Sequence, residues 1–245
     1  MRKITASIAS ILLKTYMRLY KSDFRLVQMR SYHLKEAAQL LARQFCADEP
    51  LCQALGITEE EIKDFFFEQV KFSSAKGLGV VVEHNSGRVV GVMTIEDHKD
   101  QMPVDATKLS PKVAPIGQIL DRVKLPTALE PETCGEVYYV GIGAVDSAYR
   151  SQNILRTMII GSYTQMVSKG YKMGYAKISS PAVLRSIQRI EKMLPFPFFK
   201  QGELKQADEI PELVSSTPGQ LKNFKLALIH WGYGAYQGQP LEVIA

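Results

Sequence analysis

The sequence is poor in cysteine and has no pattern of metal ligands. Its three cysteines, Cys46, Cys52 and Cys134, form no Cys-x-x-Cys pair and are too few for a disulfide framework, which favours a reducing compartment. We expect them to be small buried apolar side chains. The four histidines are scattered without His-Glu-x-x-His spacing, so the sequence predicts no metal site.

Long apolar runs and nucleotide-binding motifs are also missing. No stretch approaches the roughly 18 apolar residues of a membrane-spanning helix, so no transmembrane segment is expected. Gly141-Ile142-Gly143 lacks the third glycine of the dinucleotide fingerprint, and no Gly-x-x-x-x-Gly-Lys-Ser/Thr occurs. Basic residues are not gathered with aromatic residues on one stripe, so we expect no nucleic-acid partner.

The overall composition is that of an ordinary globular protein, with 46% hydrophobic and 22% charged residues among 245. The net charge of +5 suits an anionic cofactor, a nucleic acid or an acidic membrane surface, and charge alone does not choose among them. We predict a cytoplasmic protein, with a mitochondrial location as the alternative because of the N-terminal segment.

That segment, residues 1–22, has no acidic residue and five basic ones. On a helical wheel its lysines and Arg18 lie on one side, opposite Ile4, Ile8, Leu12 and Leu19, which predicts a basic amphipathic helix. Such a helix is a mitochondrial transit segment, an anchor lying on a membrane surface, or a helix that packs on the rest of the protein. It is also where a protein partner would bind.

Strand-like and helix-like segments alternate through residues 23–245, which predicts a single domain with a mixed sheet covered by helices. Asn85 and Gly87 favour a hairpin between two strands. Residues 98–133 carry five prolines and form either an excursion with a short helix or a lid, with a solvated insertion as the alternative to a functional lid. The predicted strands are 24–29, 79–83, 88–96, 135–145, 174–178 and 224–229, and the predicted helices are 33–45, 58–74, 152–168 and 181–192.

The junction after the strand at 135–145 carries the clearest chemical signal. This strand is so continuously apolar that we expect it to be buried on both faces. It turns into a helix through residues 146–153, where free backbone N–H groups and the helix dipole favour an anion such as a pyrophosphate. Arg150 adds a positive charge there.

Residues 140–158, with Ala148-Tyr149-Arg150 and the apolar helix that follows, resemble the acetyl-CoA-binding motif of the GCN5-related N-acetyltransferases. The resemblance implies an α/β (α+β) fold with a mixed, mostly antiparallel central sheet flanked by helices, and acetyl-CoA as acyl donor. Asn153 and Leu155 stand where the family has small residues; Asn tolerates the left-handed backbone of glycine, whereas Leu adds bulk. The donor-binding residues that the resemblance implies are Ile142, Gly143, Ala144, Arg150, Ser151, Gln152, Asn153, Ile154 and Leu155.

A second motif, Asp48-Glu49-Pro50-Leu51, resembles a segment of the insect-type arylalkylamine N-acetyltransferases in which the Glu is the general base. The resemblance therefore implies that Glu49 is catalytic. Pro50 favours an extended backbone at Glu49, so the helix ends there and the carboxylate stands on a semi-rigid turn. The alternative is a solvated acid on a turn.

The departing thiolate of the donor needs a proton. Many relatives use a Tyr on the late helix, where this sequence has Ile190. The insect-type enzymes use a pair of serines; the resemblance implies that Ser179 or Ser180 corresponds to the first, whereas Val183 stands in place of the second. The alternative is that these serines cap the helix that begins at Pro181. Phe65, Phe66 and Phe67 line an acceptor site or belong to the core.

Two functions follow from these observations. The first is an N-acetyltransferase acting on a small primary amine of arylalkylamine or polyamine type. The second is a degenerate relative that binds acyl-CoA weakly or serves as a structural subunit, favoured by Asn153, Leu155, Ile190 and the basic N-terminal segment.

Overall fold

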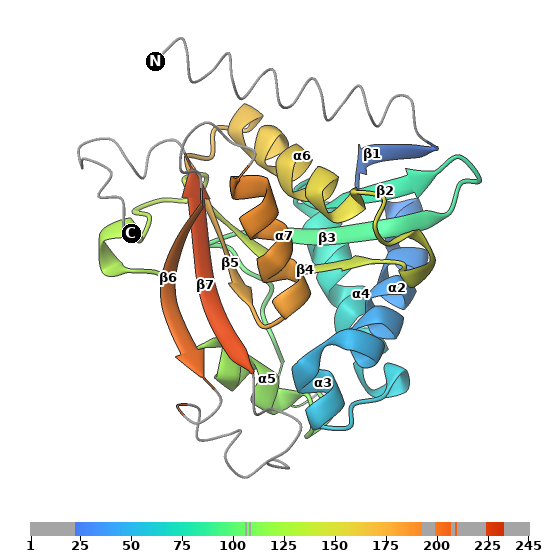
Figure 1. Cartoon of the computed structure of the whole chain (residues 1–245), viewed down its shortest axis with the longest axis horizontal. Coiled ribbons are helices and arrows are strands. Elements are labelled where there is room, and N and C mark those ends of the chain that lie inside the picture. The colour runs from blue at the N-terminus through green and yellow to red at the C-terminus, as the bar shows by residue number, and fades with distance from the viewer. Residues whose placement is uncertain are drawn as a thin grey trace.

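A seven-stranded sheet organises the computed structural model, which describes residues 23–105, 107, 109–192, 199–206, 209 and 224–232 (Figure 1). The strand order is β1-β2-β3-β4-β5-β7-β6, and every neighbouring pair is antiparallel except β4 and β5. The predicted mixed, mostly antiparallel sheet is thus confirmed. The strands are β1 (Phe24–Gln28), β2 (Val80–His84), β3 (Val89–Asp97), β4 (Val137–Val145), β5 (Met173–Ile178), β6 (Phe199–Gln206) and β7 (Lys225–Gly232).

Helices cover both faces of the sheet. Successive β2 residues point to opposite faces, so Val80 and Val82 join a core beneath α6 and α7, whereas Val81 joins a core beneath α2 and α4. Figure 1 shows α6 and α7 together on the side of the sheet nearest the viewer. The helices are α2 (Leu34–Asp48), α3 (Pro50–Ala54), α4 (Glu59–Ala75), α5 (Ala114–Leu120), α6 (Ile154–Ser168) and α7 (Pro181–Glu191).

A capping box forms the start of α4. The Thr58 side chain accepts a hydrogen bond from the Glu61 backbone N–H, and the Glu61 carboxylate accepts one from the Thr58 N–H at 2.9 Å. Three glutamates in the first turn add a favourable interaction with the helix dipole.

The sheet opens between β4 and β5. Residues 137–140 pair with residues 173–176, and beyond them β4 continues to Val145 against β3 alone. The β3–β4 register shifts between Met93 and Ile95, where the Thr94 hydroxyl accepts a hydrogen bond from the Ile142 N–H at 3.0 Å. At this bulge the side chains of β4 change the face of the sheet to which they point. Val140 packs on the α6 side, whereas Ile142, two residues later, packs on the α2 side.

The expectation that this strand is buried on both faces is therefore wrong for its second half. Gly141, Ile142 and Gly143 are each only half-buried, because the strand leaves β5 and borders an open cavity. A continuous apolar run does not distinguish a strand with two neighbours from one that has lost a neighbour halfway.

Two elements, β6 and α3, are absent from the sequence-based prediction, whereas α5 is the short helix expected as one alternative within residues 98–133. β6 is an edge strand with alternating exposure and many Lys, Gln and Glu residues, so its hydrophobic pattern is weak. α3 has only five residues, too few for a helical period. α5 lies within the proline-containing insertion, whose Ile119, Val123 and Leu125 are buried in a third apolar cluster.

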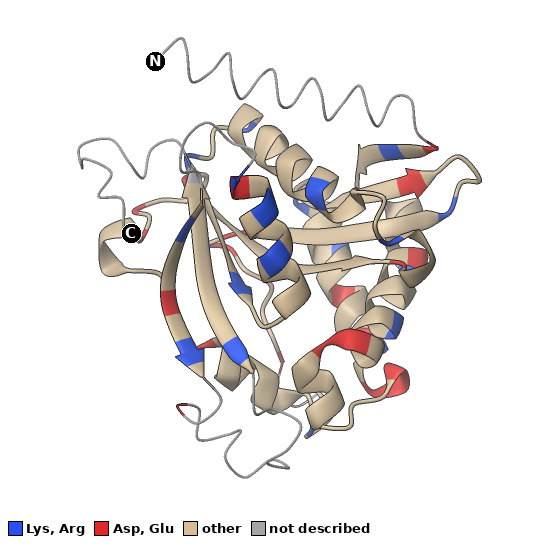
Figure 2. Cartoon of the chain, viewed as in Figure 1, with Lys and Arg blue, Asp and Glu red and all other residues tan. Residues whose placement is uncertain are grey.

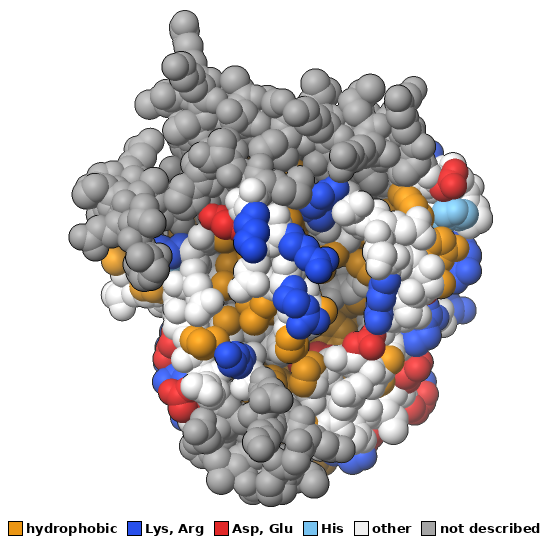
Figure 3. Space-filling model, viewed as in Figure 1, with side chains coloured by type: hydrophobic (Ala, Val, Ile, Leu, Met, Phe, Trp, Pro, Cys, Tyr) orange, Lys and Arg blue, Asp and Glu red, His pale blue; other side chains and the backbone are white. Residues whose placement is uncertain are grey.

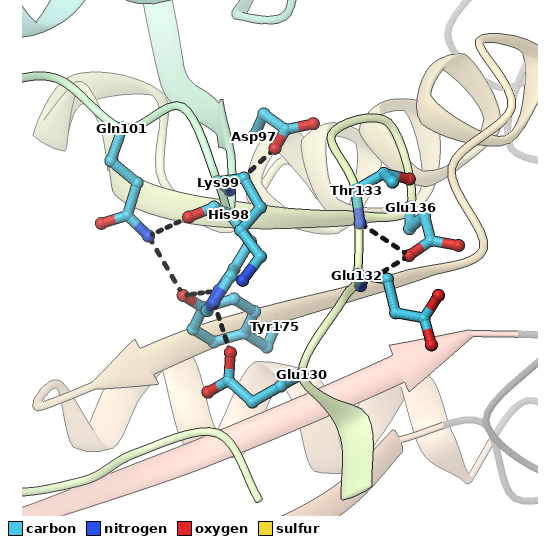
Figure 4. A network of polar contacts seen from close by, with 9 residues as sticks. All are labelled: Asp97, His98, Lys99, Gln101, Glu130, Glu132, Thr133, Glu136 and Tyr175. Atoms are coloured by element: carbon cyan, nitrogen blue, oxygen red, sulfur yellow. Dashed lines mark hydrogen bonds and ion pairs between the residues drawn. The ribbon is translucent and has the colours of Figure 1, made fainter. Parts of the chain in front are cut away.

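Polar contacts also attach this insertion to the sheet (Figure 4). The His98 ring makes hydrogen bonds to the Tyr175 hydroxyl at 2.9 Å and to the Glu130 carboxylate at 2.8 Å, and Gln101 donates to the same hydroxyl. At least part of the insertion is thus packed on the sheet rather than solvated, and none of its described residues borders the cavity between β4 and β5.

The predicted N-terminal helix at 1–22 lies outside the described residues. Within the described part of the chain, no helix is both long and apolar enough to cross a membrane. In those same residues, no group of three or more His, Cys, Asp or Glu side chains is placed to hold a metal ion.

Candidate active site

The opening between β4 and β5 forms a cavity of about 880 Å³. The second half of β4, the turn into α6, the end of β5, α7 and the α2–α3 junction all border it. Figure 3 views this face, where apolar atoms lie in the hollow and Lys and Arg side chains stand around it. Such a mostly apolar cleft with a few convergent polar groups is the usual form of a small-molecule site.

Glu49 lies at the α2–α3 junction and contributes a carboxylate to this cavity. Its backbone is extended (φ −79°, ψ 122°), as expected before Pro50, which is the first residue of α3. Oε2 accepts a hydrogen bond from the Cys52 N–H at 2.7 Å and so caps α3. Oε1 is buried and has no hydrogen-bond partner among the described residues.

Burial changes the acidity of Glu49. The residue is only 8% exposed, so the alternative of a solvated turn acid does not describe it. Loss of hydration raises the pKa of the carboxyl group, and the nearby polar groups of Ser179, Cys52 and Leu51 only partly oppose this. A carboxylate with a raised pKa and an uncommitted oxygen is equipped to accept a proton.

Two serines lie in another segment of the cavity lining, and Ser179 is near the Glu49 carboxyl group. Ser179 and Ser180 both border the cavity, between the end of β5 and the start of α7. Ser180 occupies the N-cap position of α7, yet its hydroxyl makes no capping hydrogen bond. Ile190 also borders the cavity, and only 3% of it is exposed because it packs in the core beneath α6 and α7.

The turn into α6 has an uncommon backbone. Ser151 (φ 66°) and Asn153 (φ 63°) are both left-handed, so Asn153 adopts the conformation that glycine reaches most easily. Asn153 is the N-cap of α6, and the first residues of that helix, Ile154 and Leu155, border the cavity. The first N–H groups of a helix have no partner within it. Leu155 also packs against the core.

Nearly all the predicted donor-binding residues border the cavity. Ile142, Gly143, Ala144, Arg150, Ser151, Asn153, Ile154 and Leu155 do so, whereas Gln152 is exposed and does not. The structure therefore brings these residues together with Glu49, Ser179 and Ser180, although they come from four separate segments.

Arg150 is tied to α2 rather than extended into the cavity. Its guanidinium donates to the Gln44 side-chain oxygen at 2.6 Å and pairs with the Asp48 carboxylate. A second pair runs the opposite way, from Arg43 on α2 to Asp146 at 3.0 Å. Two Arg–Asp pairs thus fix the turn to the helix that ends at Glu49.

Other predicted site residues lie elsewhere. Phe66 is 1% exposed and packs against Phe45 in the core, and none of Phe65, Phe66 and Phe67 borders the cavity. Among the cysteines, Cys52 is buried and Cys46 half-buried, but Cys134 is exposed, so the expectation of burial is wrong for Cys134.

Four cationic residues that were not predicted from the sequence also border the cavity: Arg156, Lys177, Arg185 and Arg189. Their signal in the sequence is weak. The four-residue spacing of Arg185 and Arg189 places them on one side of α7, but such spacing is common on solvated helices.

Comparison with known proteins rests on structure alone, because no protein-family model matches this sequence and no curated protein is significantly similar to it. The C-terminal condensation domain of Ebony, solved in complex with beta-alanyl-dopamine, superposes with a TM-score of 0.69 at 15% identity, over 86% of this chain and 99% of that chain. Arylalkylamine N-acetyltransferase 2 from Aedes aegypti superposes with a TM-score of 0.64 at 14% identity, over 86% and 99%.

A third solved structure is the polyamine N-acetyltransferase of Drosophila melanogaster, with a TM-score of 0.63 and 15% identity over 86% of this chain and all of that one. The fold is that of the GCN5-related N-acetyltransferases. In this N-acetyltransferase fold the cavity, the turn into α6 and Glu49 lie in one place of the molecule, so the two motifs found in the sequence meet at a single site.

Proposed function

We propose that this protein transfers an acetyl group from acetyl-CoA to a small primary amine, with Glu49 as general base. The observation that carries the proposal is the Glu49 carboxylate, which is buried at the cavity with Oε1 free of hydrogen bonds from described residues. Only a neutral amine attacks a thioester, so a base must remove one proton from the ammonium form, directly or through water.

The cavity suits a donor of this shape. Beyond Val140 the edge of β4 that faces β5 has no strand partner in the described structure, so its backbone groups are available to an extended chain such as pantetheine. The start of α6 offers backbone N–H groups and the positive end of the helix dipole for a diphosphate. The donor-binding residues are thus those of β4 and of the turn at 150–155.

The chemistry forms a C–N bond and breaks a C–S bond. Glu49 accepts the proton of the amine, the amine nitrogen attacks the thioester carbonyl, and backbone N–H groups near Ile142 to Ala144 stabilise the oxyanion. As the C–S bond breaks, the hydroxyl of Ser179 or Ser180, both of which border the cavity, donates its proton to the departing thiolate and takes up the second proton from the nitrogen of the new amide.

The acceptor class rests on the similar structures. Two of them are named for arylalkylamines and polyamines, and the Ebony domain was solved with a dopamine derivative. Small primary amines of the arylalkylamine or polyamine type are therefore the proposed acceptors.

A non-catalytic acyl-CoA-binding or structural subunit is the second candidate. The Arg150–Asp48 pair favours it, because this pair occupies the guanidinium group of the turn into α6. Leu155 in place of a small residue and Ile190 in place of a Tyr, both at the cavity, also favour it.

Calorimetric titration with acetyl-CoA, followed by a panel of arylalkylamines and polyamines, tests the proposal. Micromolar binding, about −8 kcal/mol or tighter, together with acetylation of at least one amine is the expected result. Leu155→Ala serves as the comparison for the loop, because Ala keeps the helix while removing bulk. If the wild type neither binds acetyl-CoA nor acetylates any amine, the enzyme proposal is wrong. Binding without turnover would favour the second candidate.

A further inference from the structure

Positive charge predominates on the cavity wall. The described residues that border the cavity include five cationic side chains and two carboxylates, Asp48 and Glu49. Lys and Arg positions lie along α6 and α7 (Figure 2) and surround the hollow on this face (Figure 3). The cations are Arg150, Arg156, Lys177, Arg185 and Arg189. A mostly apolar cavity with such a rim attracts a polyanion.

Some of these cations already have carboxylate partners. Arg150 pairs with Asp48, and Lys177 pairs with Asp121 at 2.9 Å. By contrast, none of the described carboxylates forms an ion pair with Arg185 or Arg189. Within the described structure, the charge of these two arginines is therefore uncompensated at the rim of the cavity.

Arg185 and Arg189 stand on a helix that is held in place. They are four residues apart, so they lie on one side of α7 about 6 Å apart along its axis. The opposite side of α7 buries Ile187 and Ile190 in the core beneath α6. Two guanidinium groups projecting from an anchored helix are arranged to bind one phosphate, since arginine recognises phosphate oxygens with paired N–H donors.

We propose that Arg185 and Arg189 bind the ribose 3′-phosphate of the CoA donor, as an anion subsite separate from the turn into α6. This inference rests on the proposed function. The donor has a diphosphate and a terminal monoester phosphate, and the backbone N–H groups at the start of α6 suit the diphosphate. The monoester phosphate then remains for the arginines across the cavity.

With this subsite, the turn into α6 can bind the donor although its Arg150 is paired with Asp48. Because Asp48 neutralises Arg150, the turn has less positive charge than its sequence indicates. Arg185 and Arg189 supply that charge from α7, and they would make affinity depend on a part of the donor far from the thioester.

Calorimetric titration with acetyl-CoA and with acetyl-dephospho-CoA, which lacks only the 3′-phosphate, tests this inference. We expect the wild type to bind acetyl-CoA about tenfold or more tightly than the dephospho form. Arg185→Gln and Arg189→Gln should each weaken acetyl-CoA binding, and the double variant should bind both ligands equally. Lys192→Gln is the matched control, because Lys192 follows the same helix, loses the same charge and does not border the cavity.

The outcomes separate this inference from the proposed function. Equal affinity of the wild type for both ligands would overturn the phosphate subsite and leave the N-acetyltransferase proposal standing. Equal weakening of both ligands in the arginine variants, or the same loss in Lys192→Gln, would show that these arginines act through the general field only and would also overturn it. If the wild type binds neither ligand, the proposed donor is wrong and the subsite is wrong with it.

Discussion

Two regions that border the cavity, the α2–α3 junction and the turn into α6, differ in how they present chemistry. At the α2–α3 junction Glu49 is buried, caps α3 and has a raised pKa because it has lost its hydration. In the turn into α6, Ser151 and Asn153 are exposed and left-handed. The first region depends on the identity of one side chain, and the second depends on the path of the chain.

This contrast predicts that substitutions in the two regions have unequal effects. In the proposed mechanism the base is a buried carboxylate, and of the two described carboxylates at the cavity only Glu49 is buried, whereas Asp48 is exposed. The proposed diphosphate site depends on backbone conformation, and Asn153 adopts the left-handed conformation without glycine.

Glu49→Gln should have the largest effect, because it removes the base and little else. The glutamine amide keeps an oxygen to accept from the Cys52 N–H, so we expect kcat/KM for the amine to fall about 10²- to 10⁴-fold while the Kd for acetyl-CoA stays the same. Steady-state kinetics and calorimetry measure the two quantities. Glu96→Gln is the matched control, since Glu96 is also buried with a raised pKa but does not border the cavity. Equal loss in both variants would remove Glu49 from catalysis.

The pH dependence of catalysis and of stability should reveal the raised pKa of Glu49. Because burial raises the pKa of Glu49, the base loses its proton only above the ordinary Glu value of about 4.3, and the acid limb of kcat/KM should lie above that value. Between the unfolded and the folded pKa the native state binds more protons than the unfolded state, so the Glu49 contribution to stability falls as pH rises through that window.

Urea unfolding of wild type and Glu49→Gln at several pH values measures this contribution. The variant should gain stability relative to the wild type as pH rises across the window and keep a constant difference above it. A difference that does not change with pH would show that Glu49 has the same pKa in both states.

Local signals in the sequence predicted the parts of this site that depend on neighbouring residues. The hairpin at Asn85 and Gly87 and the extended backbone before Pro50 each involve residues close in sequence, and both are present. The helix and strand periods did the same for most of the sheet and its helices.

The remaining features depend on residues far apart in the chain. Arg150 and Asp48 are 102 positions apart, so no local pattern in the sequence indicates that Arg150 is paired with a carboxylate. Glu49 borders the same cavity as residues of β5 and α7, which are far from it in the sequence. The edge strand β6 has too few apolar residues for its alternation to be recognised.

Ser151→Gly tests the left-handed backbone of the turn into α6 directly. A non-glycine residue in the left-handed region costs about 1–2 kcal/mol, and glycine loses part of this gain through its greater freedom when unfolded, so we expect a net stabilisation of about 0.5–1 kcal/mol. Ser147→Gly is the control, because Ser147 lies in the preceding right-handed 3₁₀ turn and its replacement should destabilise the protein by a similar amount. Urea unfolding measures both, and destabilisation by both glycines would contradict the strain at Ser151.

Asp48→Asn should have the smallest effect. It removes the ion pair that joins the end of α2 to the turn into α6. The Arg150–Asp48 pair is about half exposed, at 46% and 47% of the two side chains, so it is worth at most about 1 kcal/mol. Removing the carboxylate releases the guanidinium for the donor phosphates, and acetyl-CoA should bind up to about fivefold more tightly. Arg150→Gln should weaken binding, and the double variant should match Arg150→Gln, because Asp48 acts only through Arg150. Weaker binding by Asp48→Asn would mean instead that the pair itself shapes the turn, so that the attachment to α2 matters more to the donor than a free charge.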